Sequence, residues 1–291
     1  MTGGGRAAET RRELLVRLTF SPAAFAGVLA LLWWHHRLGT SAPTDVVLAL
    51  LAGAAAYEVA VMTGRVRQPV PLLVAVTFSA ALAGLGLAFP GDPAGRGVAR
   101  ALLLVAAVLA AFLPHLRASR DGDLERLLAT LFPVVYVGFL LGLLRELGDG
   151  SDGASRIALV VVASKASDAG GWLVGTTIGR HRMLPSVSPG KTWEGTVAGL
   201  LFAAGAAVAM VALVGPVPGL ASSRAAAAIF GLVVGAASIV SGLTHSALKR
   251  RCGVKHASAL LPGVGGVLDV VDSLLLAGPA AWLWSLAWGL S

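Results

Sequence analysis

Residues 127–144 read LLATLFPVVYVGFLLGLL, an uncharged apolar run long enough to cross the hydrocarbon core of a bilayer as a helix. Similar runs recur along the whole chain of 291 residues, of which 56% are hydrophobic and 13% charged. A water-soluble domain of this size could not bury that much apolar surface in one core. We therefore expect an all-α polytopic membrane helix bundle.

Apolar runs of about 17–25 residues predict roughly nine transmembrane helices. They are expected near residues 18–34, 46–62, 70–89, 101–114, 127–144, 157–178, 196–214, 225–240 and 267–288. The fourth and eighth are short enough that a re-entrant segment is an alternative. The first is interpreted as a retained helix, because His35, His36 and Arg37 follow it where a secretory signal requires small residues.

The distribution of Lys and Arg predicts which side of the membrane each connecting segment faces. With the N-terminus inside, 16 of the 23 basic residues fall in inner segments and 6 in outer ones. The positive-inside rule then places the N-terminus and the polar loops in the cytosol, which suits a multi-pass protein of the inner (plasma) membrane. These clusters and anionic lipid headgroups explain the net charge of +8, so nucleic acid is not an expected partner.

The chain is interpreted as one membrane domain in three parts. Residues 1–17 form a flexible cytosolic N-terminus, 18–126 the N-terminal membrane helices, and 127–291 the C-terminal membrane core. Cys252 is the single cysteine of the sequence, so an intrachain disulfide and a cysteine-based metal site are excluded.

Lys165 and Asp168 lie inside the sixth predicted span. Charges within a bilayer face a cavity or a partner and are usually functional, so Asp168 is a candidate site residue. The alternative is structural: the two residues are three apart on one helical face and could simply neutralise each other.

A second polar segment, SVSPGKTWEG at residues 186–195, precedes the seventh span. Ser188 can cap that helix, Lys191 and Thr192 can donate to phosphate oxygens, and exposed amides at a helix start favour an anion. The segment is not a Walker P-loop, because the upstream glycine is missing. An ordinary capping box with a solvated Glu194 is the alternative.

The third polar segment reads SALKRRCGVKH at 246–256 and LPGVGGVLDVVD at 261–272. It joins a basic stretch, a glycine-rich turn and two carboxylates, Asp269 and Asp272, on one helical face. Carboxylate oxygens suit Mg²⁺, which also bridges substrate phosphates. A positive-inside cluster would explain the basic residues but not two aspartates at the start of a membrane helix.

These segments resemble the CDP-diacylglycerol synthases, also called phosphatidate cytidylyltransferases. The segment 188–195 is similar to the family's Ser-Pro-x-Lys-Thr-x-Glu-Gly, and 167–175 to its Asp-Thr-x-Ala-Tyr-x-x-Gly. The resemblance extends from about residue 132 to 279 and is only topological before that. The family's C-terminal signature is matched in register by Ser246, Lys249, Arg250, Lys255, Ser258, Leu261, Pro262, Gly263, Gly265, Gly266, Asp269 and Asp272.

The chain also departs from the family pattern. Gly242 stands where the family carries a metal-site carboxylate, and His245 stands for an acid. His256, Val264 and Val270 replace an Asp, a His and an Arg of the signature. These changes are expected to weaken the metal site, and they favour either altered lipid selectivity or loss of activity.

The resemblance implies a CTP-dependent cytidylyltransferase that converts phosphatidate, or a related lipid phosphate, to CDP-diacylglycerol and pyrophosphate. CTP, the lipid phosphate and membrane lipids are the implied partners, a homodimer is left open, and Mg²⁺ is the implied cofactor, as two ions or one weakened site. The implied catalytic residues are Lys191, Lys249, Arg250 and Asp269. The implied substrate-binding residues are Ser188, Thr192, Glu194, Lys255, Ser246, Gly265 and Gly266, and the implied metal ligands are Asp168, Asp269 and Asp272.

Two other classes of function are weighed against the enzyme. A catalytically impaired relative that binds lipid or a partner protein is favoured by Gly242, which removes a metal ligand. A transporter is disfavoured, because its site is expected near the bilayer midplane whereas these motifs cluster in inner loops and adjoining helix ends.

Overall fold

The computed structural model describes residues 37–64, 71–113, 123–258, 260 and 265–288, together with a few positions between 27 and 35. The expected N-terminal segment 1–17 lies outside the described residues, as does most of the first predicted span.

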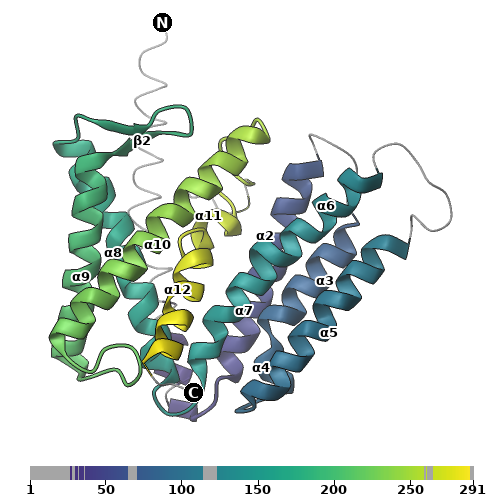
Figure 1. Cartoon of the computed structure of the whole chain (residues 1–291), viewed down its shortest axis with the longest axis horizontal. Coiled ribbons are helices and arrows are strands. Elements are labelled where there is room, and N and C mark those ends of the chain that lie inside the picture. Colours follow the sequence, from purple (N-terminus) through teal and green to yellow (C-terminus); the bar gives the residue numbers. More distant parts are fainter. Residues whose placement is uncertain are drawn as a thin grey trace, which may run out of the picture.

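The described chain is helical apart from one short hairpin, which confirms the all-α membrane bundle (Figure 1). Seven of its helical segments are long and apolar enough to cross a membrane. The N-terminal helices are α2 (Ala42–Gly64), α3 (Leu72–Ala83), α4 (Leu85–Ala88) and α5 (Pro93–Phe112). A continuous helical segment follows as α6 (Asp123–Pro133), the π-turn η2 (Val134–Phe139), α7 (Leu140–Arg145) and the 3₁₀-turn η3 (Glu146–Gly148). The remaining elements are α8 (Gly153–Thr177), β1 (Arg182–Leu184), β2 (Ser188–Thr192), α9 (Trp193–Val214), α10 (Arg224–Arg251), α11 (Val267–Val271) and α12 (Leu274–Ala287).

The fourth and eighth predicted spans are helices long enough to cross a membrane, so their length no longer favours a re-entrant course. The fourth, α5, has 20 residues and the eighth, α10, has 28. Helix α5 begins eight positions before the predicted residue 101, because Asp92 caps it by accepting from Gly95 N and Pro93 occupies its first turn. The third predicted span instead breaks at Gly84 into α3 and α4.

The π-turn η2 follows Pro133, which lacks the N–H that a regular helix would use at that point. Two glycines near this turn allow close approach to α3. A Cβ at Gly138 would lie 2.5 Å from Ser79 Cα, and one at Gly142 would lie 2.9 Å from the Leu82 carbonyl oxygen. Small residues at such contacts are how membrane helices reach tight packing.

The helices form two groups that meet along α2, α7, α11 and α12. In the first group α2 packs on α3, which also contacts η2 and α5. In the second group α8 packs on α9, and α10 packs on both α9 and α12. Helix α12 contacts α7 and α11 contacts α2, so the short α11 lies where the two groups adjoin (Figure 1).

A buried ion network ties together the start of α2, the start of α5 and the end of α7. These helix ends lie at the end of the bundle opposite to the hairpin (Figure 1). Arg145 pairs with Asp45 at 2.8 Å and with Asp149 at 2.6 Å. Arg96 pairs with Glu146 at 3.0 Å and also with Asp149. Both arginine side chains are at most 1% exposed, so two charges that were predicted in outer connecting segments are buried and neutralised.

Candidate active site

The hairpin β1–β2 lies between α8 and α9 at one end of the bundle (Figure 1). Its strands are antiparallel, with Arg182 opposite Thr192 and Leu184 opposite Ser188. The predicted cap at Ser188 is wrong: Ser188 begins β2, and α9 is capped by Thr192, whose Oγ1 accepts from Gly195 N at 3.1 Å. The strand extends the chain for four residues beyond Ser188, which moves the helix start to Trp193.

Thr192 and Glu194 make the side-chain contacts at the N-terminus of α9. The Thr192 side chain is buried, so its hydroxyl serves the cap rather than an open surface. Glu194 is partly exposed, but its carboxylate is held by His181: it accepts from His181 N at 3.2 Å and lies 2.6 Å from His181 Nδ1. Glu194 therefore fastens the end of the α8–β1 connection to the start of α9.

Lys191 projects from β2 across α10. Its Nζ donates to the Ile239 carbonyl oxygen at 3.1 Å, and a Cβ at Gly242 would lie 2.9 Å from the same nitrogen. Burial lowers the pKa of the Lys191 ammonium below its ordinary value, while the charges of Asp168 and Asp272 oppose that shift. The ammonium is therefore inside the site, within electrostatic range of two of the predicted metal ligands.

Lys165 and Asp168 do make the predicted contact, with Nζ and Oδ2 3.6 Å apart. The hydrogen bonds of Lys165 go elsewhere, to the Val270 carbonyl oxygen at 2.9 Å and Ser273 Oγ at 2.8 Å. The Asp168 side chain is 45% exposed and accepts no hydrogen bond from the described part of the chain. Lys165 thus links α8 to the α11–α12 junction, and the Asp168 carboxylate is left open for a further ligand.

Asp269 is the centre of a hydrogen-bond network. Lys249 Nζ lies 2.6 Å from Oδ1, and His245 Nε2 lies 3.0 Å from the same oxygen. Oδ2 accepts from the backbone amides of Ala257 at 3.1 Å and Gly266 at 3.0 Å. Both carboxylate oxygens of Asp269 are therefore engaged with the protein itself.

Asp272, at the C-cap of α11, resembles Asp168 in having a carboxylate free of hydrogen bonds from the described residues. It interacts electrostatically with Asp168, Lys165 and Lys249. Its backbone carbonyl oxygen accepts from Ser241 Oγ. The structure thus gathers Asp168, Asp272 and Lys191 from three separate elements, α8, the C-cap of α11 and β2.

Gly265 and Gly266 allow two carboxylates to approach the backbone. Gly265 has a φ of +113°, and a Cβ there would lie 2.4 Å from Asp269 Oδ2. A Cβ at Gly266 would lie 2.3 Å from Glu58 Oε2. Gly265 and Gly266 were predicted to bind substrate. The atoms nearest to a Cβ at each position belong to acidic side chains of the protein itself.

The remaining predicted residues differ in exposure. Ser246 Oγ donates to the Gly242 carbonyl oxygen at 2.8 Å. Arg250 is exposed and its Nε lies 3.5 Å from the Val187 carbonyl oxygen, between α10 and the hairpin. Lys255 is exposed just beyond α10. Arg250 and Lys255 thus offer positive charge at the surface of the site.

The donor set can be tested against a divalent cation. Within the described ranges, no group of three or more His, Cys, Asp or Glu side chains is arranged to hold a metal ion. Mg²⁺ is commonly held by one or two carboxylates, with substrate phosphates and water completing its shell. Asp168 and Asp272, whose carboxylates are free of hydrogen bonds, fit that chemistry, whereas Asp269 has no free oxygen to offer.

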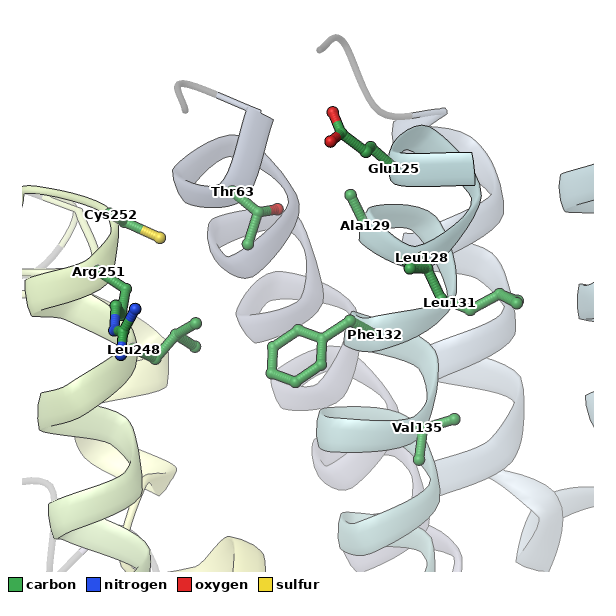
Figure 2. Close-up of a pocket in the computed structure, with 10 residues that line it drawn as sticks. All are labelled: Thr63, Glu125, Leu128, Ala129, Leu131, Phe132, Val135, Leu248, Arg251 and Cys252. Carbon is green, nitrogen blue, oxygen red and sulfur yellow. The ribbon is translucent and has the colours of Figure 1, made fainter. Parts of the chain in front are cut away.

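A groove of about 640 Å³ opens between α2, α6 and α10 (Figure 2). Its walls are mainly apolar, with Leu128 and Phe132 on α6 facing Leu248 on α10. Two charged side chains line it from opposite walls: Glu125 lies at one end on α6, and Arg251 lies on α10 beside Leu248 (Figure 2). An apolar cavity of this size with a few polar groups is typical of a ligand site.

Sequence reasoning missed Glu58, an acidic residue of α2 that reaches the start of α11. It lies inside the second predicted span, so the criterion that selected Asp168, a charge within an apolar run, would also have selected Glu58.

Comparison with known proteins places this geometry in context. The sequence profile described as the cytidylyltransferase family matches residues 15–287. A phosphatidate cytidylyltransferase of Mycobacterium bovis is 33% identical over 156 residues, covering 53% of this chain and 49% of that protein. Proteins of the same name from Haemophilus influenzae (35% identical, 52% of each chain) and Pseudomonas aeruginosa (39% identical, 46% of this chain and 49% of that protein) are also similar. The chain thus aligns with about half the length of these curated relatives.

Proposed function

The chain belongs to the cytidylyltransferase family, and on that premise we propose that it transfers the cytidylyl group of CTP to a lipid phosphate. Phosphatidate is the acceptor named by the similar proteins, and the product would then be CDP-diacylglycerol. The observation that carries the proposal is that the Lys191 ammonium lies within electrostatic range of Asp168 and Asp272, two carboxylates that accept no hydrogen bond from the described residues.

In the proposed reaction an oxygen of the lipid phosphate attacks the α-phosphorus of CTP. A new P–O bond forms as the bond to the oxygen that bridges the α- and β-phosphates breaks, and pyrophosphate leaves with that electron pair. Such transfers depend on positioning and on neutralising charge rather than on a covalent enzyme intermediate. Mg²⁺, held by Asp168 and Asp272, would supply part of that neutralisation.

The protein's own cations supply the rest. Lys191 would donate to phosphate oxygens inside the site, while the exposed Arg250 and Lys255 would attract the triphosphate from solution. Asp269 would act through Lys249 and His245, whose positions it fixes, rather than as a metal ligand. The proposed metal site would then use two carboxylates, because both oxygens of Asp269 already accept hydrogen bonds from the protein.

The lipid phosphate is proposed to reach the site from the groove of Figure 2, with an acyl chain against Leu128, Phe132 and Leu248. The groove adjoins the C-terminal turns of α10, which also carry Lys249 and Arg250. A chain held there would leave only the headgroup to meet CTP. We further propose that the protein lies in the inner membrane with the hairpin end of the bundle facing the cytosol. The basic residues in the connecting segments at that end support this orientation.

Purified protein in lipid nanodiscs, supplied with labelled CTP and a panel of lipid phosphates, tests the proposal. Labelled CDP-lipid and an equal amount of pyrophosphate are expected only when a lipid phosphate and Mg²⁺ are both present. Asp272→Asn should abolish both products.

Binding without turnover is the second candidate function, because Gly242 stands where the synthase family carries a metal-site carboxylate. It predicts no pyrophosphate from the wild-type protein with any lipid phosphate, and no recovery in the Gly242→Asp, His245→Glu double variant. Together, these two results would favour a lipid-binding or partner-binding membrane protein over an enzyme.

A further inference from the structure

Glu58 is a buried acid on an N-terminal helix, far in sequence from every predicted site residue. It lies six positions before the end of α2 and is only 3% exposed. No Lys or Arg pairs with it in the part of the chain that the structure describes. A buried carboxylate without a cation needs other hydrogen-bond donors, because its desolvation is otherwise uncompensated.

The donors come from the segment that carries the C-terminal signature. Val267 N donates to Glu58 Oε1 at 3.0 Å and Leu268 N donates to Oε2 at 2.8 Å. These are the first two amides of α11, which have no partner within their own helix. Ser258 Oγ also donates to Oε1, at 2.6 Å. Glu58 therefore holds both ends of the connection between residues 258 and 267.

Asp269 holds the same connection from its other side. It accepts from Ala257 N and Gly266 N, each one position from a residue that Glu58 binds. The two carboxylates approach adjacent glycines so closely that neither glycine has room for a Cβ. The described residues at the two ends of this connection, 257–258 and 266–268, are therefore held between a carboxylate of α2 and a carboxylate of α11.

We infer that Glu58 is a positioning residue for the proposed cytidylyl transfer, holding the start of α11 so that Asp269 and Asp272 keep their places relative to Lys249 and Lys191. The inference rests on the proposed function for its catalytic consequence. It makes α2 part of the active site, although the resemblance to the synthase family is only topological in that half of the chain.

Glu58→Gln is the decisive variant, because it keeps the volume of the side chain but replaces one acceptor oxygen by an N–H₂ group that faces a backbone N–H donor. The amides of Val267 and Leu268 should then exchange hydrogen for deuterium at least about tenfold faster, which is a tenfold rise in the opening equilibrium. The ratio kcat/KM for CTP should fall by at least about tenfold. Ser258→Ala, which removes one of the three donors, should give a smaller change of the same kind.

Asp45→Asn is the matched control, a buried carboxylate on the same helix that is 13 positions, about 20 Å, from Glu58 and pairs with Arg145 instead. It should lower the temperature of thermal unfolding but leave KM for CTP and exchange at Val267 and Leu268 unchanged. Glu58→Asp keeps both acceptor oxygens and should recover part of the loss seen in Glu58→Gln.

The two proposals fail separately in this experiment. If the wild-type protein releases no pyrophosphate, the proposed function is wrong. Deuterium exchange would still report whether Glu58 holds the start of α11. Active wild-type protein with normal exchange and normal kinetics in Glu58→Gln would overturn the inference. So would a Glu58→Gln variant whose only defect is the lower unfolding temperature shared with Asp45→Asn.

Discussion

The ammonium of Lys191 lies against Gly242, so closely that a Cβ at Gly242 would be 2.9 Å from Nζ. The synthase family carries a carboxylate at that position of its signature. In this chain the lysine tip occupies part of the space, and its hydrogen bond goes to the Ile239 carbonyl oxygen. The tip of a lysine is flexible, so a small acidic side chain at position 242 can be admitted by a shift of Nζ.

Gly242→Asp is therefore expected to fold and to pair its carboxylate with Lys191. A third acidic group beside Asp168 and Asp272 should lower the Mg²⁺ concentration at half-maximal activity by about tenfold, because ligand charge raises cation affinity. Titration of pyrophosphate release against Mg²⁺ measures this. Gly242→Asn has the same size without the charge and should not change the Mg²⁺ requirement; an equal effect of both variants would contradict the prediction.

Asp269→Asn should destabilise the protein and abolish turnover. The amide cannot satisfy two backbone donors, Lys249 and His245 together, so buried donors lose their acceptor. We expect the free energy of unfolding to fall by about 3–5 kcal/mol, the range for removing one partner of a buried ion pair. Denaturation in detergent measures the loss. Asp269→Asn in a Lys249→Met background should cost less than in the wild type, and an unchanged cost would show that the two residues are not coupled.

Hydropathy was enough to predict the fold, and its errors have a common physical cause. Window averages end a span where charges begin, yet Arg96 and Arg145 lie within helical segments because acidic partners neutralise them. The helix α5 therefore begins earlier than expected. The π-turn after Pro133 and the break at Gly84 depend on packing against neighbouring helices, which no local average contains.

Site residues that belong to a short sequence motif could be predicted. Site residues whose partners lie far away in the sequence could not. The motifs pointed to Asp168, Lys191 and Asp272, which the structure brings within electrostatic range of one another. The partner of the C-terminal signature was missed, since Glu58 bonds to residues about 200 positions away. Local pattern could not decide between Ser188 and Thr192 as the cap, because that choice depends on strand pairing with β1.

Activity should decline on the alkaline side at a pH below the ordinary pKa of lysine. Burial lowers the pKa of Lys191, so its ammonium, which we propose binds phosphate, loses its proton as the pH rises through that lowered value. The profile of kcat/KM for CTP between about pH 7 and 10 measures the decline. Lys191→Arg should move the alkaline limb to higher pH, because a guanidinium stays protonated. A limb at the same pH in both proteins would assign the titration to another group.

Cysteine labelling tests the predicted sidedness in a Cys252→Ser background. Gly190→Cys lies in the hairpin and Ser222→Cys in the exposed connection between α9 and α10; both positions are exposed. Alternation of the α9 span places them on opposite sides of the membrane. An impermeant reagent added to intact cells should label position 222 and reach position 190 only after permeabilisation. Labelling of position 190 in intact cells would reverse the orientation.

Filling the groove of Figure 2 should impair use of the lipid substrate without affecting CTP. Leu128 lines the groove on α6 and is 55% exposed, so Leu128→Trp would add bulk to the wall that also carries Phe132. If an acyl chain occupies that space, KM for the lipid phosphate should rise by at least about tenfold, a loss of roughly 1.4 kcal/mol of binding, while KM for CTP stays constant. Leu124→Trp is the matched control, because Leu124 lies on the same helix, is 67% exposed and does not line the groove. The kinetics are measured in nanodiscs of fixed lipid composition, so that both variants meet the same substrate concentration in the bilayer. Equal values of KM for the lipid in the two variants would exclude the groove as the acyl-chain site and leave the site beside Asp168 and Asp272 to be reached by another route.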